Sequence, residues 1–241
     1  MKLIDKRVLI TGAAKRIGRI FSLLVAREGG EVLIHHNNSA TEANTLKDEI
    51  QELGQKAIIF QADFSDTEST HKFVEHVFDS YKVDAVINNA ALFGQLSWST
   101  TKIEDWRQHH SVNLEAPFFI SQAFAKSIKK ERTGKIINIL DWRALKPGAD
   151  HLPYTISKAG LAALTKSLAV SLAPDISVNG IALGAILPPA DSGYDKNITD
   201  KLPISRWATI SELEETMLFL LTGPDYITGE IIHLDGGRHL I

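Results

Sequence analysis

Short β-branched runs alternate with longer amphipathic stretches along the whole chain, and this alternation constrains the fold more than any other feature. The predicted strands are Arg7–Thr11, Glu31–His36, Ala57–Gln61, Ala85–Asn88, Lys135–Leu140, Ser177–Ala182 and Ile231–Leu234. The predicted helices are Arg16–Glu28, Ala40–Leu53, Glu68–Tyr81, Glu104–Lys130, Tyr154–Leu172 and Ser211–Leu221. Several strands are apolar on both faces, as central parallel strands covered by helices on both sides are. We therefore expect an α/β fold: a Rossmann-type doubly wound parallel sheet of about seven strands, in a single domain over residues 1–241.

Composition and charge exclude several classes of protein. The net charge of −3 provides no field that would attract nucleic acid or an anionic membrane. The chain has no cysteine, which excludes disulfides, thiolate catalysis and cysteine-ligated metals, and we expect no metal site. The N-terminal segment carries an acid and three bases before an apolar run that is too short for a signal core. No apolar stretch approaches the roughly 20 residues that span a bilayer, so we expect a cytoplasmic protein.

A glycine-bearing turn near the start of the chain predicts a dinucleotide site. Gly12 follows the first strand, and Ile17 and Gly18 lie at the start of the following helix. Gly12 permits a tight turn, and Gly18 lets the helix pack close to the sheet, so that the helix N-terminus offers free N–H groups to a pyrophosphate. The alternative is a plain turn without a ligand, but the strand–turn–helix context favours a dinucleotide.

The end of the second strand indicates NADPH rather than NADH as the cofactor. Proteins that bind NAD place an acid there for the ribose 2′-hydroxyl, whereas this chain has no carboxylate in the segment Ile34–Ser39. Hydrogen bonds from polar and cationic side chains can receive a 2′-phosphate instead. The residues that we expect to do so are Arg16, His36, Asn37, Asn38 and Ser39. The other interpretation of His35 and His36 is that they are strand-end residues with partly solvated rings.

Tyr154 and Lys158 lie four residues apart, and Asp141 precedes the tyrosine by thirteen positions. Residues with the first spacing share one face of a helix, so the ammonium can lie beneath the phenol. A phenol with a pKa of about 10 is a poor proton donor near neutrality. We expect the neighbouring cation to bring the pKa of Tyr154 closer to working pH.

Together these motifs resemble the short-chain dehydrogenase/reductase family from Lys6 to the C-terminus. The residues that carry the resemblance are Thr11, Gly12, Gly18, Asp63, Asn88, Asn89, Ala90, Asn113, Tyr154, Lys158, Asp235, Gly236 and Gly237. The resemblance implies that Asp63 and the main chain of Phe64 hold the adenine. It also implies that Lys158 bonds the nicotinamide ribose and that Asn113 keeps a water linking Lys158 to solvent. Further cofactor contacts are implied for Asn89 and Ala90 near the adenosine ribose, Gly184, and the backbone of Ile186 at the carboxamide.

At two positions where the chain departs from the usual family pattern, it is similar to the pteridine reductase branch of the family. This branch includes dihydrofolate- and dihydromonapterin-type reductases. Arg16 stands where the family usually has glycine, and Asp141 stands where it usually has serine. Phe93 matches the aromatic that in this branch stacks a flat heterocycle against the nicotinamide. Ala91 stands where the branch often carries a serine that bonds the pterin. The implied substrate residues are Arg16, Phe93, Asp141, Tyr154 and Tyr194, the last in a lid over residues 187–205.

The expected reaction is reduction of a pteridine C=N bond, with Tyr154 as proton donor and Lys158 stabilising the phenolate. Asp141 would repel the alkoxide formed from a ketone, but it suits a substrate that is protonated as it is reduced. The alternative is that Asp141 only bonds nearby main chain or pairs with Arg143. Trp142 and Arg143 either line the pocket mouth or pack beneath the lid.

Two other functions remain open from the residues alone. The first is an NADPH-dependent carbonyl reductase acting on 3-oxoacyl thioesters, sugars or small ketones. The second is a non-catalytic NADP(H) sensor, which would have no need of a tuned phenol. By resemblance to the family we also expect a homotetramer formed through the two long helices, and a small-molecule substrate.

Overall fold

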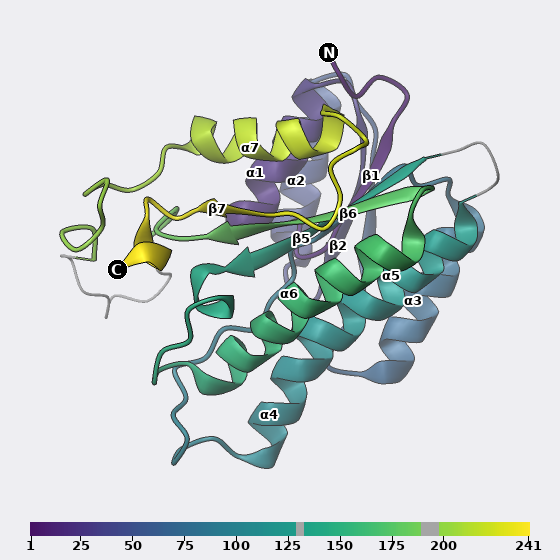
Figure 1. Cartoon of the computed structure of the whole chain (residues 1–241). Helices are drawn as coiled ribbons and strands as arrows, with labels where there is room; N and C mark the ends of the chain where they lie inside the picture. The colour runs from purple at the N-terminus through teal and green to yellow at the C-terminus, as the bar shows by residue number, and fades with distance from the viewer. Residues whose placement is uncertain (129–132, 189–197) are drawn as a thin grey trace.

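A seven-stranded parallel sheet forms the centre of the protein, in the order β3-β2-β1-β4-β5-β6-β7 (Figure 1). The computed structural model describes residues 1–128, 133–188 and 198–241. The strands are β1 Arg7–Ile10, β2 Glu31–His36, β3 Ala57–Gln61, β4 Ala85–Asn88, β5 Gly134–Asp141, β6 Ile176–Leu183 and β7 Ile231–Leu234. All neighbouring strands pair in parallel. The expected α/β fold with a doubly wound sheet is confirmed.

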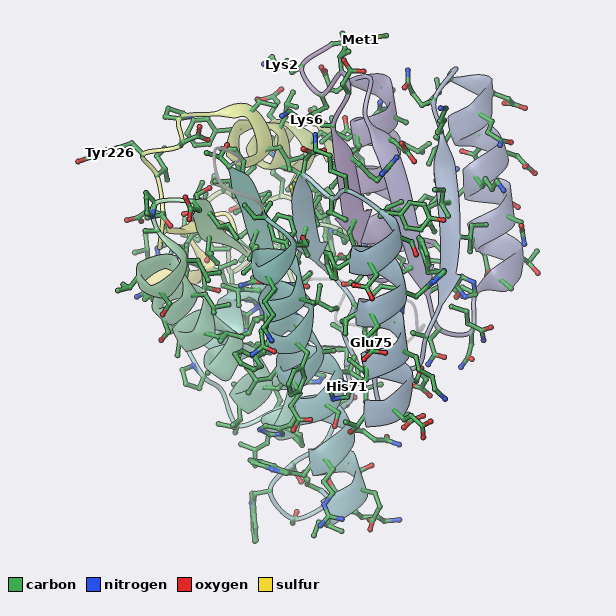
Figure 2. The ribbon with its side chains drawn as sticks, turned by 90° about the vertical axis from the view of Figure 1, so that its right-hand side faces the viewer. Met1, Lys2, Lys6, His71, Glu75 and Tyr226 are labelled. Atoms are coloured by element: carbon green, nitrogen blue, oxygen red, sulfur yellow. The ribbon has the colours of Figure 1, made fainter. Side chains whose placement is uncertain are left out.

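Helices cover both faces of the sheet. They are α1 Arg16–Arg27, α2 Ala40–Glu52, α3 Thr67–Ser80, α4 Ile103–His110, α5 Ala116–Ser127, α6 Leu152–Leu172 and α7 Ile210–Thr222. Val8 and Ile10 of β1 pack with α1, α2 and α7, whereas Leu9 between them packs with α3, α5 and α6, as expected of a strand whose side chains alternate. Figure 2 views the layer of helices that contains α3, α5 and α6, with His71 and Glu75 on the outer side of α3. Among the described residues, no helix has both the length and the apolar character that crossing a bilayer requires.

The prediction of one continuous helix over Glu104–Lys130 is wrong. A π-helical turn, Ser111–Glu115, separates α4 from α5, and α5 ends at Ser127. Pro117 explains the interruption, because it has no N–H to donate and its ring collides with the carbonyl four residues earlier in a regular α-helix. The wider turn carries Asn113 into the interior, where it is fully buried. Residues 129 and 130 lie outside the described residues.

The strand order reverses between β1 and β4, and this position determines where a ligand can enter. In open α/β sheets the loops after two such strands diverge and leave a crevice at the carboxyl ends. Here the loop after β1 leads into α1, and the loop after β4 begins with Asn89. The next strand pair is fixed in register by Asn88 and Asn138, whose side chains form a buried 2.8 Å hydrogen bond.

Candidate active site

The turn between β1 and α1 is held by the loop after β4. The Thr11 hydroxyl accepts hydrogen bonds of 2.9 Å from the backbone N–H groups of both Asn89 and Ala90. In return, the Asn89 amide donates to the carbonyls of Thr11 at 2.8 Å and Gly12 at 3.1 Å. Asn89 therefore fixes the turn itself, a role that the expected ribose contact did not include.

The turn packs too closely on its neighbours for any residue but glycine at two positions. Gly12 has a φ of 61°, and a Cβ on this residue would lie 2.9 Å from Ala90 Cα. A Cβ on Gly18 would lie 2.1 Å from the Gly12 carbonyl oxygen. The helix α1 starts without a side-chain cap and without an acid in its first turn, so its N–H groups and positive dipole end remain available to an anion. Ile17 packs against the core beneath this turn.

Arg16 occupies a backbone conformation that usually requires glycine. Its φ is 51°, which costs a non-glycine residue about 1–3 kcal/mol. The guanidinium donates a 2.7 Å hydrogen bond to the Pro188 carbonyl, at the start of the predicted lid. Arg16 thus links the phosphate turn to the loop after β6, which is consistent with its expected position near a substrate.

The two histidines that end β2 are buried, with exposed fractions of 2% and 5%, so the alternative of partly solvated rings is wrong. His35 Nδ1 accepts the Gly12 N–H at 3.1 Å, and Nε2 then donates to the Ala62 carbonyl at 3.1 Å. Its ring stacks on Phe64 at 4.0 Å between centroids. Burial lowers the pKa of His35 to about 3, so this histidine is a neutral support for the phosphate turn. The sequence carried no signal for that role.

Of the expected 2′-phosphate residues, Asn37, Asn38 and Ser39 follow β2 directly, whereas Arg16 begins α1 and His36 is buried at the end of the strand. The Asn37 side chain hydrogen-bonds the Asp63 carboxylate, which also accepts from the Ser65 N–H at 2.8 Å and hydroxyl at 2.7 Å. These hydrogen bonds lower the pKa of Asp63. Ser39 begins α2 without using its side chain as a cap, and Asn38 is exposed. Neither side chain has a partner within the described part of the chain, so both can meet a ligand.

Tyr154, Asp141 and Lys158 meet at the carboxyl end of β5. Asp141 ends that strand, while Tyr154 and Lys158 occupy successive turns at the start of α6. The Tyr154 hydroxyl donates to Asp141 Oδ2 at 3.3 Å. The Lys158 ammonium lies 5.9 Å from the centre of the Tyr154 ring and donates to the Ile139 carbonyl at 2.6 Å.

The expected lowering of the Tyr154 pKa is wrong in this arrangement. Burial, followed by the charge and the hydrogen bond of Asp141, raises the pKa of Tyr154 well above 10. Asp141 is within hydrogen-bond range of the phenol, whereas the ammonium of Lys158 is directed to a backbone carbonyl. Burial also lowers the pKa of Lys158 from 10.5 to about 8. Burial and Asp141 together therefore favour the protonated form of Tyr154.

Asn113 joins the helix of the tyrosine to the loop after β4. Its Oδ1 accepts from the Leu92 N–H at 2.7 Å, and its Nδ2 donates to the Leu92 carbonyl at 3.0 Å and to the Ser157 hydroxyl at 2.9 Å. Ser157 in turn donates to the Tyr154 carbonyl at 2.7 Å. The loop that carries Phe93 is thus positioned relative to Tyr154, and the expected water contact of Asn113 stays a prediction.

Phe93 is 54% exposed and forms an aromatic cluster with Tyr154 and His151. It meets Tyr154 edge to face at 4.8 Å and stacks on His151 at 4.3 Å between ring centroids. His151, in a left-handed conformation before α6, also hydrogen-bonds the Gly94 carbonyl at 2.9 Å. A histidine in a loop carries no sequence signal for such a position, and it was not predicted.

Asp141 also has the second role that was considered for it. Its Oδ1 accepts the Arg143 N–H at 2.8 Å and lies 3.6 Å from the Arg143 guanidinium, which is in turn 3.2 Å from Asp150. Because Oδ2 faces Tyr154, the main-chain and ion-pair contacts do not exclude a catalytic one.

The turn after β6 approaches the segment that follows β7. A Cβ on Gly184 would lie 2.5 Å from Asp235 Cα, so only glycine fits there. The Gly184 N–H donates to the Leu234 carbonyl at 2.9 Å, and the Ile186 N–H donates to Gly184 at 3.1 Å. Tyr194 and residues 189–197 of the predicted lid lie outside the described residues, and both remain predictions.

Comparisons with known proteins place this geometry in a family. Residues 12–239 match the family model described as enoyl-(acyl carrier protein) reductase. The 3-oxoacyl-[acyl-carrier-protein] reductase of Synechocystis sp. is 30% identical over 234 residues, which cover 95% of each chain. The L-rhamnose 1-dehydrogenase (NAD(P)(+)) of Azotobacter vinelandii is 33% identical, over 98% of each chain.

A solved structure with the same fold is FolM alternative dihydrofolate reductase 1 from Brucella canis, complexed with NADP. It matches with a TM-score of 0.90 and 31% identity, covering 100% of this chain and 97% of that one. The family model, the reductases and this structure agree across nearly the whole chain. The protein therefore belongs to the short-chain dehydrogenase/reductase family of oxidoreductases.

Proposed function

We propose that the protein is an NADPH-dependent reductase of a pteridine, acting on a C=N bond of a dihydropterin or a dihydrofolate-like compound. The observation that carries this proposal is the Asp141 carboxylate, 3.3 Å from the Tyr154 hydroxyl. Hydride addition to a ketone builds up alkoxide charge before the proton arrives, and a neighbouring carboxylate would repel that charge. A C=N nitrogen is more basic than a carbonyl oxygen, so it can take up its proton before or together with the hydride, and no anion then builds up beside Asp141. The similarity to the FolM structure supports the same substrate class.

The residues around the phosphate turn fit NADP. Gly12 and Gly18 let the turn and α1 pack as closely as a pyrophosphate-binding turn requires, and the polar side chains of Asn38 and Ser39 replace the acid that would favour NAD. The solved structures of FolM and of a Burkholderia cenocepacia short-chain dehydrogenase contain NADP. When bound, NADPH supplies the hydride.

Tyr154 supplies the proton. Asp141 favours the protonated phenol, and Lys158 stabilises the phenolate that remains. The raised pKa of Tyr154 means that the phenol holds its proton across the neutral range. Once the proton has left, the phenolate needs a nearby positive charge. Lys158 provides it below about pH 8, because its pKa lies there. Asp141 accepts the hydrogen bond of the Tyr154 hydroxyl and so orients the phenol and favours its protonated form until the proton is transferred.

Phe93 is the platform for the flat ring of the substrate. Its ring is half-exposed and lies edge-on to Tyr154, so a heterocycle that stacks on its open surface lies near the proton donor. Offset stacking contributes about 0.5–1.5 kcal/mol beyond the burial of apolar area. His151 supports the Phe93 ring by a second stacked contact.

A carbonyl reductase is the second candidate. Ala91 offers no hydroxyl to a pterin, and the relatives at 30% and 31% identity include 3-oxoacyl-[acyl-carrier-protein] reductases of Synechocystis sp. and Aquifex aeolicus. For this function Asp141 would have to be tolerated beside a developing alkoxide.

The assay follows NADPH absorbance at 340 nm with dihydrofolate, dihydrobiopterin, an acetoacetyl thioester and a small ketone. We expect turnover of the dihydropterins, and its loss in the Tyr154→Phe variant. Turnover of the thioester alone would replace the first candidate by the second. Tight NADPH binding without any turnover would leave only a nucleotide sensor.

A further inference from the structure

Arg238 is a cation near Asp141 that has no role in the chemistry described so far. Two short helical turns, η2 (Trp142–Ala144) and η3 (Arg238–Leu240), contact each other where β5 and β6 end, with the C-terminus of the chain beside them (Figure 1). The guanidinium carbons of Arg143 and Arg238 lie 4.7 Å and 4.2 Å from the centre of the Trp142 ring. Both cations are thus held against one indole by cation–π contacts.

The carboxylates of this cluster are already committed. Arg143 is paired with Asp141 and Asp150. Asp235 accepts from His239 Nδ1 at 2.8 Å and from the Gly237 N–H at 3.0 Å. Arg238 is left without a direct partner, because its guanidinium forms no hydrogen bond or ion pair with any residue of 1–128, 133–188 or 198–241, and the charges of Asp141, Asp150 and Asp235 act on it only from beyond bonding range.

The guanidinium of Arg238 is partly removed from water, because the residue is half-buried. Burial, and next the charge of Arg143, lower the pKa of Arg238, while the charges of Asp141, Asp150 and Asp235 act in the opposite direction. A carboxylate or phosphate would meet up to five guanidinium donors in a plane that Trp142 already fixes, and it would remove the repulsion between the two arginines.

We propose that Arg238, supported by Trp142 and Arg143, binds an oxyanion on the tail of the substrate. The two oxygens of Asp141 join the two parts of the site: Oδ2 faces Tyr154, and Oδ1 receives the Arg143 N–H. The substrate is then a planar heterocycle whose tail carries a carboxylate or a phosphate. This inference rests on the proposed pteridine reduction for the nature of the ring, but not for the binding of the anion.

The first test compares two substrates with one ring system. Dihydrofolate carries a glutamate tail, and 7,8-dihydrobiopterin carries a neutral one. We expect Arg238→Gln to raise the KM for dihydrofolate about tenfold, as loss of a charge-assisted hydrogen bond would, and to leave both kcat values and the KM for dihydrobiopterin within about twofold. Arg238→Lys should recover part of the loss. Arg27→Gln, which removes a guanidinium paired with Glu214 on the α1–α7 side, is the matched control.

The second test does not depend on turnover. Binding of p-aminobenzoyl-glutamate, and separately of inorganic phosphate, is measured by ligand-observed NMR on the whole protein with NADP⁺ present. We expect at least one of them to bind to the wild type and to the Arg27→Gln control, and not to Arg238→Gln. The preferred probe then distinguishes a carboxylate tail from a phosphate tail.

The turnover and binding tests distinguish failure of the anion site from failure of the proposed pteridine reduction. If pterins are not reduced but the tail probe still requires Arg238, the anion site stands and the ring assignment fails. If the Arg238→Gln variant binds the probes as the wild type does, or raises both KM values equally, the anion site is wrong.

Discussion

Two charged neighbours act on the pKa of Tyr154, in opposite directions. Asp141 raises its pKa through charge and a hydrogen bond, and Arg143 lowers it, while burial has the largest effect and also raises it. Lys158 shares the same helical face, but its ammonium is bound to the Ile139 carbonyl. In the proposed reaction the phenol therefore starts protonated, and the buried ammonium becomes important only after the proton has left.

The Asp141→Ser variant tests whether the carboxylate assists proton transfer from Tyr154. We expect turnover of a dihydropterin to fall about 10- to 100-fold, within the range of a proton-transfer contribution. The pKa of Tyr154 should also fall toward its ordinary value, because two of its raising causes are removed. Titration of phenolate absorbance against the Tyr154→Phe variant measures that shift. Unchanged pterin turnover would show that Asp141 has no part in the proton supply.

Lys158→Met tests the cost of burying an ammonium. The folded-state pKa of about 8 lies below the unfolded value of 10.5, so the unfolded chain binds more protons between these two pH values and the wild type gains stability as pH rises through them. At pH 7 the variant should be more stable by about 1–3 kcal/mol, and it should be inactive. The advantage should shrink above pH 8.

Chemical denaturation at pH 7 and pH 10 measures the difference. Lys166→Met, at an exposed position of the same helix, should change the free energy of unfolding by less than about 0.5 kcal/mol at either pH. A Lys158→Met variant less stable than the wild type at pH 7 would mean that the bond to Ile139 outweighs the burial of the charge.

At the scale of elements, periodicity located the strands well and failed where a helix changed type. The bounds of β2, β3, β4 and β7 agree with the predicted ones, because each is a short apolar run between turn residues. The sequence keeps a helical apolar pattern across the π-helical turn Ser111–Glu115. The one added residue per turn cannot be read from apolar spacing.

The site residues also divide into those that a local sequence pattern predicts and those that it does not. Gly12, Gly18 and Tyr154 belong to local motifs whose spacing is visible in the sequence. The roles of His35, His151 and Arg238 depend on contacts between distant parts of the chain. No local pattern distinguishes a histidine that supports a turn from one that faces solvent, and no pattern places residue 238 beside residue 142.

Gly18→Ala tests the packing of α1 on the phosphate turn. An added Cβ would lie 2.1 Å from the Gly12 carbonyl oxygen, a backbone atom that cannot move without shifting the turn. We expect the free energy of unfolding to fall by about 1–3 kcal/mol and the Kd for NADP⁺ to rise at least about tenfold. Differential scanning fluorimetry and nucleotide titration measure the two effects.

Gly54→Ala is the control for that substitution. Its Cβ would meet nothing within 4 Å, although its φ of 80° makes alanine unfavourable. It should therefore lower stability without changing the Kd for NADP⁺. Equal nucleotide affinity in Gly18→Ala and the wild type would contradict the close-packing account of the turn.

At the scale of the whole molecule, the site is assembled from segments far apart in the chain. The turn after β1, the loop after β4, the end of β5 and the start of α6 meet at one edge of the sheet. α4 extends away from the rest of the molecule in both views (Figures 1 and 2). It carries Ile103 and Trp106, which are 58% and 39% exposed, and α6 carries Val170, which is 82% exposed. Apolar side chains this exposed on neighbouring helices favour contact with a second copy of the chain.

The proposed homotetramer through these helices predicts a particular response to one substitution. We expect the wild type to sediment at about four times the 26.6 kDa chain mass, and Val170→Asp to shift it toward smaller species, because a carboxylate buried at an interface loses its hydration. Leu53→Asp, at an exposed apolar position just after α2 on the other layer, should leave the assembly intact. Sedimentation velocity at several concentrations distinguishes these outcomes. A monomeric wild type would overturn the tetramer, whereas an intact tetramer in Val170→Asp would move the interface from α6 to another surface.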